Sequence, residues 1–108
     1  MNMIRCTLSA RAYRFVYGDD GFSQAIKQTA TGTMSILFDL LPRKEELIQL
    51  ANGQEFTVKN VTHHVGADNT VSYSIDLGAA GLGDAKGFDE GLERWRTIGF
   101  AVTVKEQI

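Results

Sequence analysis

Two adjacent histidines, His63 and His64, are the residues of this sequence best suited to catalysis or metal binding, because imidazole exchanges protons near neutral pH and binds metal ions. They lie in the stretch FTVKNVTHHVG, residues 56–66, which otherwise reads as a β-strand. Adjacent residues of a strand point to opposite faces, so the two imidazoles are not expected to bind one ion. We therefore predict neither a metal site nor a cofactor here.

The pairing of this strand with the next stretch decides where each histidine points. A three-residue loop at 67–69 would place His63 opposite Tyr73 on one face and His64 on the opposite, polar face. In one interpretation His63 is a half-buried histidine that packs against Tyr73. In the other, His63, Tyr73 and His64 bind a small ligand in a pocket under the glycine-rich segment 78–91, with His63 carrying a proton.

The first strand interleaves cations with aromatic rings, a combination that platforms for single-stranded nucleic acid use for phosphate contact and base stacking. The residues are Arg11, Tyr13, Arg14, Phe15 and Tyr17. The same stripe would serve equally well as core or as an oligomer interface, where tyrosine and arginine are also enriched. The net charge of -2 argues against nucleic acid as the partner.

A second cation and aromatic cluster comprises Arg94, Trp95 and Arg96. Phe88, Leu92 and Trp95 have the spacing of one helical face, which predicts a short helix before the last strand. If those neighbours do not bury Trp95, the only tryptophan, it is the strongest candidate for an interface hot spot.

Composition indicates one domain over residues 1–108. Of its residues, 44% are apolar. The chain has 11 basic and 13 acidic side chains, so its net charge gives no overall attraction to phosphate backbones or anionic lipid. No signal peptide and no apolar run long enough for a membrane span is recognisable, so we expect a cytoplasmic protein. Cys6 is the only cysteine, which excludes an internal disulfide, and its alternation with Ile4 and Leu8 predicts an inert core thiol.

The elements that must position these residues are mostly strands. Period-two alternation predicts about six strands with one or two short helices, in an antiparallel barrel or a strongly twisted sheet. Segment 42–53 satisfies both helix and hairpin rules, and we favour a hairpin in which Gly53 is left-handed and Ile48 faces Phe56. Segment 20–29 is either a short helix or the second arm of a hairpin, and 78–91 is predicted to be a glycine-rich loop.

Residues 41–77 resemble a pattern of small, functionally uncharacterised bacterial proteins, often encoded on phages, plasmids or integron gene cassettes. In that pattern a Leu-Pro-Arg precedes a short strand, a glycine turn, a strand ending in Val-x-x-Val-x-His and a last alternating strand. The matching residues here are Leu41, Pro42, Arg43, Gly53, Val58, Val61 and His63. The resemblance implies a compact, mostly β domain of unassigned function and transfers no active site.

No catalytic residue is assigned by these patterns, so an enzyme is the less favoured reading. We expect a non-enzymatic binding or interaction module that acts as a homodimer, because antiparallel hairpins leave edges that symmetric pairing covers. An unidentified protein or small molecule is compatible as a further partner.

Overall fold

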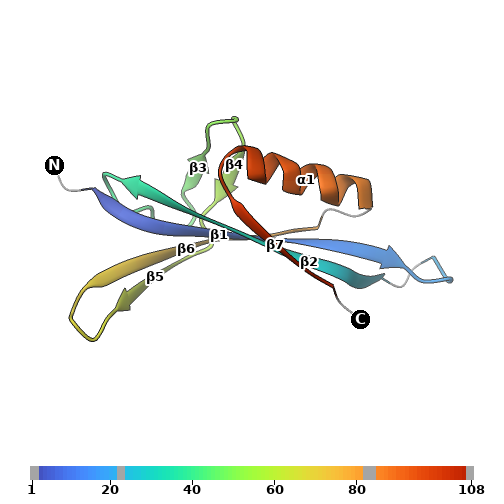
Figure 1. The fold of residues 1–108 in the computed structure, drawn as a ribbon, viewed down its shortest axis with the longest axis horizontal. Helices are drawn as coiled ribbons and strands as arrows, with labels where there is room; N and C mark the ends of the chain where they lie inside the picture. Colours follow the sequence, from blue (N-terminus) through green and yellow to red (C-terminus); the bar gives the residue numbers. More distant parts are fainter. Residues whose placement is uncertain (1–2, 22–23, 82–84, 107–108) are drawn as a thin grey trace. The chain divides into compact units, whose positions relative to one another are not determined.

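The computed structural model describes residues 3–21, 24–81 and 85–106, and these residues are mostly β. Figure 1 shows the elements in chain order. They are β1 (Ile4–Tyr17), β2 (Gln24–Phe38), β3 (Leu47–Gln49), β4 (Glu55–Thr57), β5 (Asn60–Val65), β6 (Val71–Gly81), α1 (Ala85–Thr97) and β7 (Ala101–Glu106).

Five of the strands form one sheet in the order β5-β6-β1-β2-β7, and β3 pairs with β4 in a separate two-stranded sheet. The larger sheet ends at β5 and β7 and is therefore open, so the twisted sheet is the correct one of the two predicted architectures and the barrel is not. The sheet is mixed rather than wholly antiparallel, because β6 runs beside β1 in the same direction (Figure 1).

The residues group into two compact units, which share the long strands β1, β2 and β6. Unit 1 contains residues 1–10 and 33–78, and unit 2 contains 11–32 and 79–108. The single-domain expectation stays a prediction.

The core of unit 1 follows the alternation of its strands. Cys6 and Leu8 of β1 and Ile75 of β6 are fully buried, and Val58, just after β4, is fully buried as well. The remaining buried apolar side chains of this unit are Ala10, Ile48 and Leu77.

The segment 42–58 forms the predicted hairpin. Ile48 pairs with Phe56 in antiparallel register, and the Leu50 amide donates to the Gln54 carbonyl oxygen at 2.9 Å. Gly53 has a φ of 85°, a left-handed conformation that glycine adopts without steric cost. These features confirm the turn chemistry inferred from Asn52-Gly53 and exclude a helix over 42–51.

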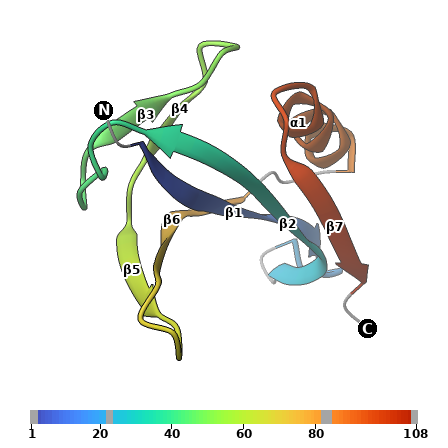
Figure 2. The same cartoon turned by 60° about the vertical axis from the view of Figure 1, so that its left-hand side comes forward.

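Strands β5 and β6 form a hairpin (Figure 2). Its register is the predicted one, with His63 opposite Tyr73, and Asn69 is left-handed at a φ of 66°. Asn60 pairs with Asp76, while the amide of the preceding Lys59 donates to the Asp76 carbonyl oxygen at 2.7 Å. Two residues of one strand thus face one residue of the other, which is a β-bulge. Val58 and Val61 are three residues apart and would face opposite sides of a regular strand, and the bulge between them changes that alternation.

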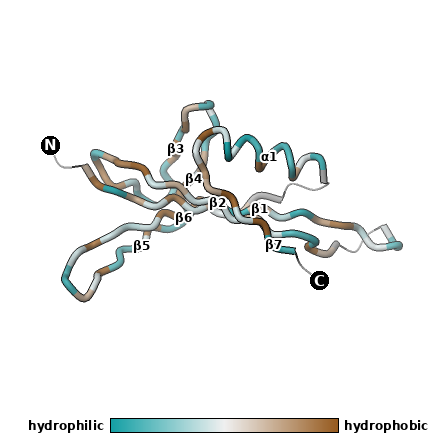
Figure 3. The backbone as a smooth tube through the Cα atoms, in the orientation of Figure 1, coloured by the Kyte–Doolittle hydropathy of each residue, from teal (hydrophilic) through white to brown (hydrophobic). Residues whose placement is uncertain are grey.

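In unit 2, α1 packs through its apolar stripe. Phe88, Leu92 and Trp95 are all buried, as the predicted helical face requires, and the Trp95 ring lies 5.6 Å from the Phe100 ring that precedes β7. Figure 3 shows hydrophilic outer turns on α1. The helix lies close to β2 at Gly32, where a Cβ atom would come within 2.9 Å of Trp95 Cε3.

The end of α1 directs the chain into β7. The Phe100 amide donates to the Trp95 carbonyl at 3.0 Å and the Gly99 amide donates to the Arg96 carbonyl at 3.1 Å. With Gly99 at a φ of 110°, this is a Schellman-type helix end. Arg94 and Arg96 lie in the last turn, where cations favour the negative end of the helix dipole.

The prediction of a loop over 78–91 is wrong for most of that segment. Residues 78–81 continue β6 and residues 85–91 begin α1, while 82–84 lie outside the described residues. Glycine within a helix costs about 1 kcal/mol relative to alanine. Burial of Phe88, Leu92 and Trp95 offsets that cost for Gly87 and Gly91, so tertiary packing overrides local propensity here.

The alternative readings of 20–29 are resolved in favour of the hairpin. The Gly21 amide donates to the Gly18 carbonyl at 3.0 Å, and β2 begins at Gln24. Residues 22 and 23 of this segment lie outside the described residues.

Cys6 is expected to react slowly with thiol reagents. Burial raises the pKa of its thiol, because desolvation penalises the thiolate, and the side chain is 0% exposed. In native protein at pH 8 we expect a disulfide-exchange reagent to modify Cys6 at least ~100-fold more slowly than in urea-unfolded protein. Equal rates in the two states would contradict burial of the thiol.

Candidate interaction surface

The two histidines point to opposite faces of unit 1, as expected. The His63 ring meets the Tyr73 ring edge-on at 4.8 Å between centroids, whereas His64 Nε2 lies 2.9 Å from the Ser74 hydroxyl oxygen. The half-buried interpretation of His63 is wrong in one respect, because the side chain is exposed. Val65, two residues farther along the same face, is 68% exposed, so side chains on the core face become less buried toward the tip of the hairpin.

A pocket of about 480 Å³ lies beside Tyr73, between β1 and β6, but neither histidine lines it. Its lining residues are Met3, Ile4, Arg5, Thr7, Thr70, Val71, Ser72 and Tyr73. The predicted cover is also missing, because residues 78–81 and 85–91 are strand and helix rather than a loop. Across residues 3–21, 24–81 and 85–106 there is no group of three His, Cys, Asp or Glu that could hold a metal ion. Tyr73 thus contacts His63 and lines this pocket, whereas neither His63 nor His64 lines it.

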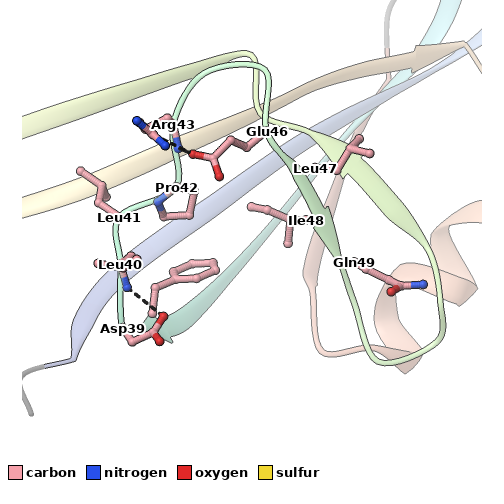
Figure 4. Close-up of a pocket in the computed structure, with 10 residues that line it drawn as sticks. Asp39, Leu40, Leu41, Pro42, Arg43, Glu46, Leu47, Ile48 and Gln49 are labelled. Carbon is pink, nitrogen blue, oxygen red and sulfur yellow. Dashed lines mark hydrogen bonds and ion pairs between the residues drawn. The ribbon is translucent and has the colours of Figure 1, made fainter.

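A second hollow, of about 540 Å³, lies between segment 38–43 and β3 (Figure 4). Ile48 and Pro42 face it from opposite sides, and the Arg43 guanidinium forms an ion pair with Glu46 at 3.1 Å near its edge. Leu40 is 78% exposed in this segment. Of its charged lining residues, Arg43 and Glu46 are paired with each other, and Asp39 accepts a hydrogen bond from the Leu40 amide at 2.9 Å.

The cations and aromatic residues of the first strand, β1, do not all lie on one face of the sheet. The side chain of Arg14 donates to Gln28 Oε1 at 3.0 Å, and Gln28 in turn donates to Glu106. Positions 14, 28 and 106 thus lie on one side of β1, β2 and β7, the side that α1 covers at Gly32. Arg14 does not join the predicted aromatic stripe.

Strand alternation then places the remaining residues on the opposite face of unit 2. We call this the Tyr13 face. It consists of Arg11, Tyr13, Phe15 and Tyr17 of β1, Lys27, Thr29 and Thr31 of β2, and Ala101, Thr103 and Lys105 of β7. The rings of Tyr13 and Phe15 lie 6.4 Å apart and are half-buried, and Tyr17 is 63% exposed. The predicted stripe therefore exists as a partly exposed surface and not as core.

Comparisons with protein-family models, curated proteins and solved structures give no match. The resemblance over residues 41–77 stays a prediction. Function has to be argued from the surface itself.

The Tyr13 face has a charge opposite in sign to that of the whole chain. Its charged side chains are Arg11, Lys27 and Lys105, whereas the chain carries a net charge of -2. Among its described strand residues there is no acidic side chain, and the nearest acids in sequence, Asp19 and Asp20, lie in the turn after β1. Within the described part of the chain, neither Lys27 nor Lys105 has an ion-pair partner. Both ammonium groups are exposed.

Sequence reasoning missed Lys27, Lys105 and the two exposed threonines, Thr31 and Thr103. The hairpin alternative for 20–29 already paired β1 with the next strand, but the pairing of β2 with β7 has no local signal in the sequence.

The Trp95 cluster consists of one buried ring and two exposed cations. Trp95 is 4% exposed, so the condition for a hot spot is not met. Arg94 and Arg96 are exposed, and Arg96 lies 3.6 Å from Glu93 in an ion pair one helical turn away. Exposed pairs of this kind contribute little to stability.

No helix within the described ranges has the length and apolar character needed to cross a membrane.

Proposed function

We propose that the protein is a non-enzymatic binding module whose contact surface is the Tyr13 face and whose partner is a polyanion. The observation that carries the proposal is the gathering of Arg11, Lys27 and Lys105 on a face without acidic strand residues. Three cations on one face attract a chain of negative charges more strongly than the net charge suggests, because screening limits each interaction to about 10 Å. The single cysteine is consistent with action in the cytoplasm, where thiols stay reduced.

The expected homodimer is also proposed, at a surface other than the Tyr13 face. A two-fold interface brings the same patch of both subunits together. On this face it would bring Arg11, Lys27 and Lys105 against the same three cations of the second copy, which is repulsive. The open edge β5 contributes no residue to the Tyr13 face and carries no such constraint.

Heparin chromatography tests the polyanion proposal, because heparin is a polyanion without aromatic bases. We expect the wild-type protein to be retained at low salt and the double variant Lys27→Glu/Lys105→Glu to elute in the flow-through. The matched control is Lys44→Glu/Lys86→Glu, which changes the net charge equally at exposed positions that are not among the residues of the face. Its elution should shift only slightly. Equal elution of the two variants, or no retention of wild type, would refute the proposal.

A further inference from the structure

The Tyr13 face carries aromatic rings as well as cations, and this combination narrows the class of polyanion. We infer that the partner is a single-stranded nucleic acid, whose phosphates contact the cations and whose bases stack on the rings. The inference rests on the proposed function, because it requires the same face to be the contact surface.

The rings are arranged for stacking. Tyr13, Phe15 and Tyr17 occupy alternate positions of β1 and therefore share a face, at intervals of roughly 6.6 Å along the strand. The first two rings are half-buried and held 6.4 Å apart, while the third is 63% exposed. A flat sheet surface with aromatic side chains is one of the surfaces on which proteins stack unpaired bases. A polyanion without bases gains nothing from these rings.

The cations flank the rings on three strands. Arg11 lies on β1 with the rings, Lys27 lies on β2 and Lys105 lies on β7. A nucleic acid strand that crosses the face can thus stack on β1 while its phosphates contact side chains of the neighbouring strands. Thr31 and Thr103 are exposed on the same face and offer hydroxyl donors of the kind that contact phosphate and sugar oxygens.

Double-stranded nucleic acid fits this surface poorly. Bases of a duplex are stacked on one another and expose only their edges, which proteins read with an element that enters a groove. The helix of unit 2 packs against the opposite face of the sheet, so it does not project from the Tyr13 face. The geometry favours a strand whose bases are free.

The test is fluorescence anisotropy with a labelled 12-nucleotide thymidine oligonucleotide, the same length of mixed-sequence duplex, and heparin as competitor. We expect the oligonucleotide to bind at least ~10-fold more tightly than the duplex. Each phosphate contact to a single strand contributes about -0.7 to the slope of log affinity against log salt, so three cations predict a slope of about -2.

Tyr17 provides the variant that separates stacking from charge, because its exposure makes loss of the fold improbable on removal of the ring. Tyr17→Ala should weaken oligonucleotide binding roughly 10-fold while leaving heparin elution unchanged. Tyr17→Phe keeps the ring and should bind like wild type. Far-UV circular dichroism of each variant checks the fold.

The two proposals fail differently. If oligonucleotide, duplex and heparin bind with similar affinity and Tyr17→Ala changes none of these affinities, the protein binds polyanions without recognising bases. Only the nucleic-acid inference is then lost. If Lys27→Glu/Lys105→Glu changes binding to none of the three, or wild type binds none, both proposals are lost. A wild-type dimer that Tyr17→Ala converts to a monomer would mean that a second copy occupies the face, and it would overturn both.

Discussion

Replacing Trp95 by alanine is expected to reduce the free energy of unfolding by about 3–5 kcal/mol, the usual cost of truncating a buried aromatic side chain. Trp95 is 4% exposed and connects α1 to β2 at Gly32 and to Phe100 at the start of β7. Domains of this size are stable by only about 5–15 kcal/mol, so the variant should be marginally folded at 25 °C. Urea unfolding followed by far-UV circular dichroism measures the loss, since the substitution removes the only tryptophan fluorophore.

The neighbouring helix residue supplies the control. Arg94→Ala lies on the exposed side of α1 and should change stability by less than about 0.5 kcal/mol. Trp95→Phe retains an aromatic ring and should fall between the two. Unfolding midpoints of Trp95→Ala and Arg94→Ala that agree within error would show that the Trp95 ring does not stabilise the packing of α1.

Hairpin register could be predicted from sequence because turn residues and strand alternation constrain each other. Gly53 and Asn69 each fit a left-handed turn position, and a one-residue slip would have moved every apolar side chain to the wrong face. Both registers, Ile48 with Phe56 and His63 with Tyr73, are confirmed. The opposite orientation of His63 and His64 followed from the same alternation.

Burial could not be predicted with the same success, because it depends on which elements cover a face. His63 shares a face with the buried Ile75 but lies farther along the hairpin, where nothing in the described residues of unit 1 buries it. Trp95 shows the converse, since it is buried where β2 approaches it at Gly32 and where the Phe100 ring packs against it. The glycine content of 78–91 predicted a loop, but the packing of the apolar side chains of α1 makes residues 85–91 helical.

The basic character of the Tyr13 face was hidden by averaging. Net charge sums all residues, and Arg14, which sequence reasoning grouped with Arg11, points to the other face and contacts Gln28. Lys27 and Lys105 are 78 residues apart and come to one face only because β2 and β7 are neighbours in the sheet. Long-range strand order is the step that a single sequence does not encode locally, so the net charge could not reveal that these cations share one face.

Gly32→Ala is expected to destabilise the protein by about 1–3 kcal/mol, although the same change in an unstrained, uncrowded position commonly stabilises by about 0.4–1 kcal/mol. The added methyl would lie 2.9 Å from Trp95 Cε3 and 3.3 Å from Phe100 Cδ1. Both contacts are with rings in the core of unit 2, which cannot move aside without disturbing the packing of α1. Steric overlap should therefore exceed the entropic gain, and urea unfolding of the variant measures the balance.

A double-mutant cycle identifies the atom responsible. In a Trp95→Phe background the indole carbon that meets the methyl is absent, so Gly32→Ala should cost at least about 0.5 kcal/mol less than in wild type, the size of coupling expected between contacting residues. Thr31→Ala, at the adjacent exposed position of β2, is the control and should have the same small effect in both backgrounds. If Gly32→Ala lowers the free energy of unfolding equally with tryptophan and with phenylalanine at position 95, contact with the Trp95 ring is not what excludes a larger residue at position 32.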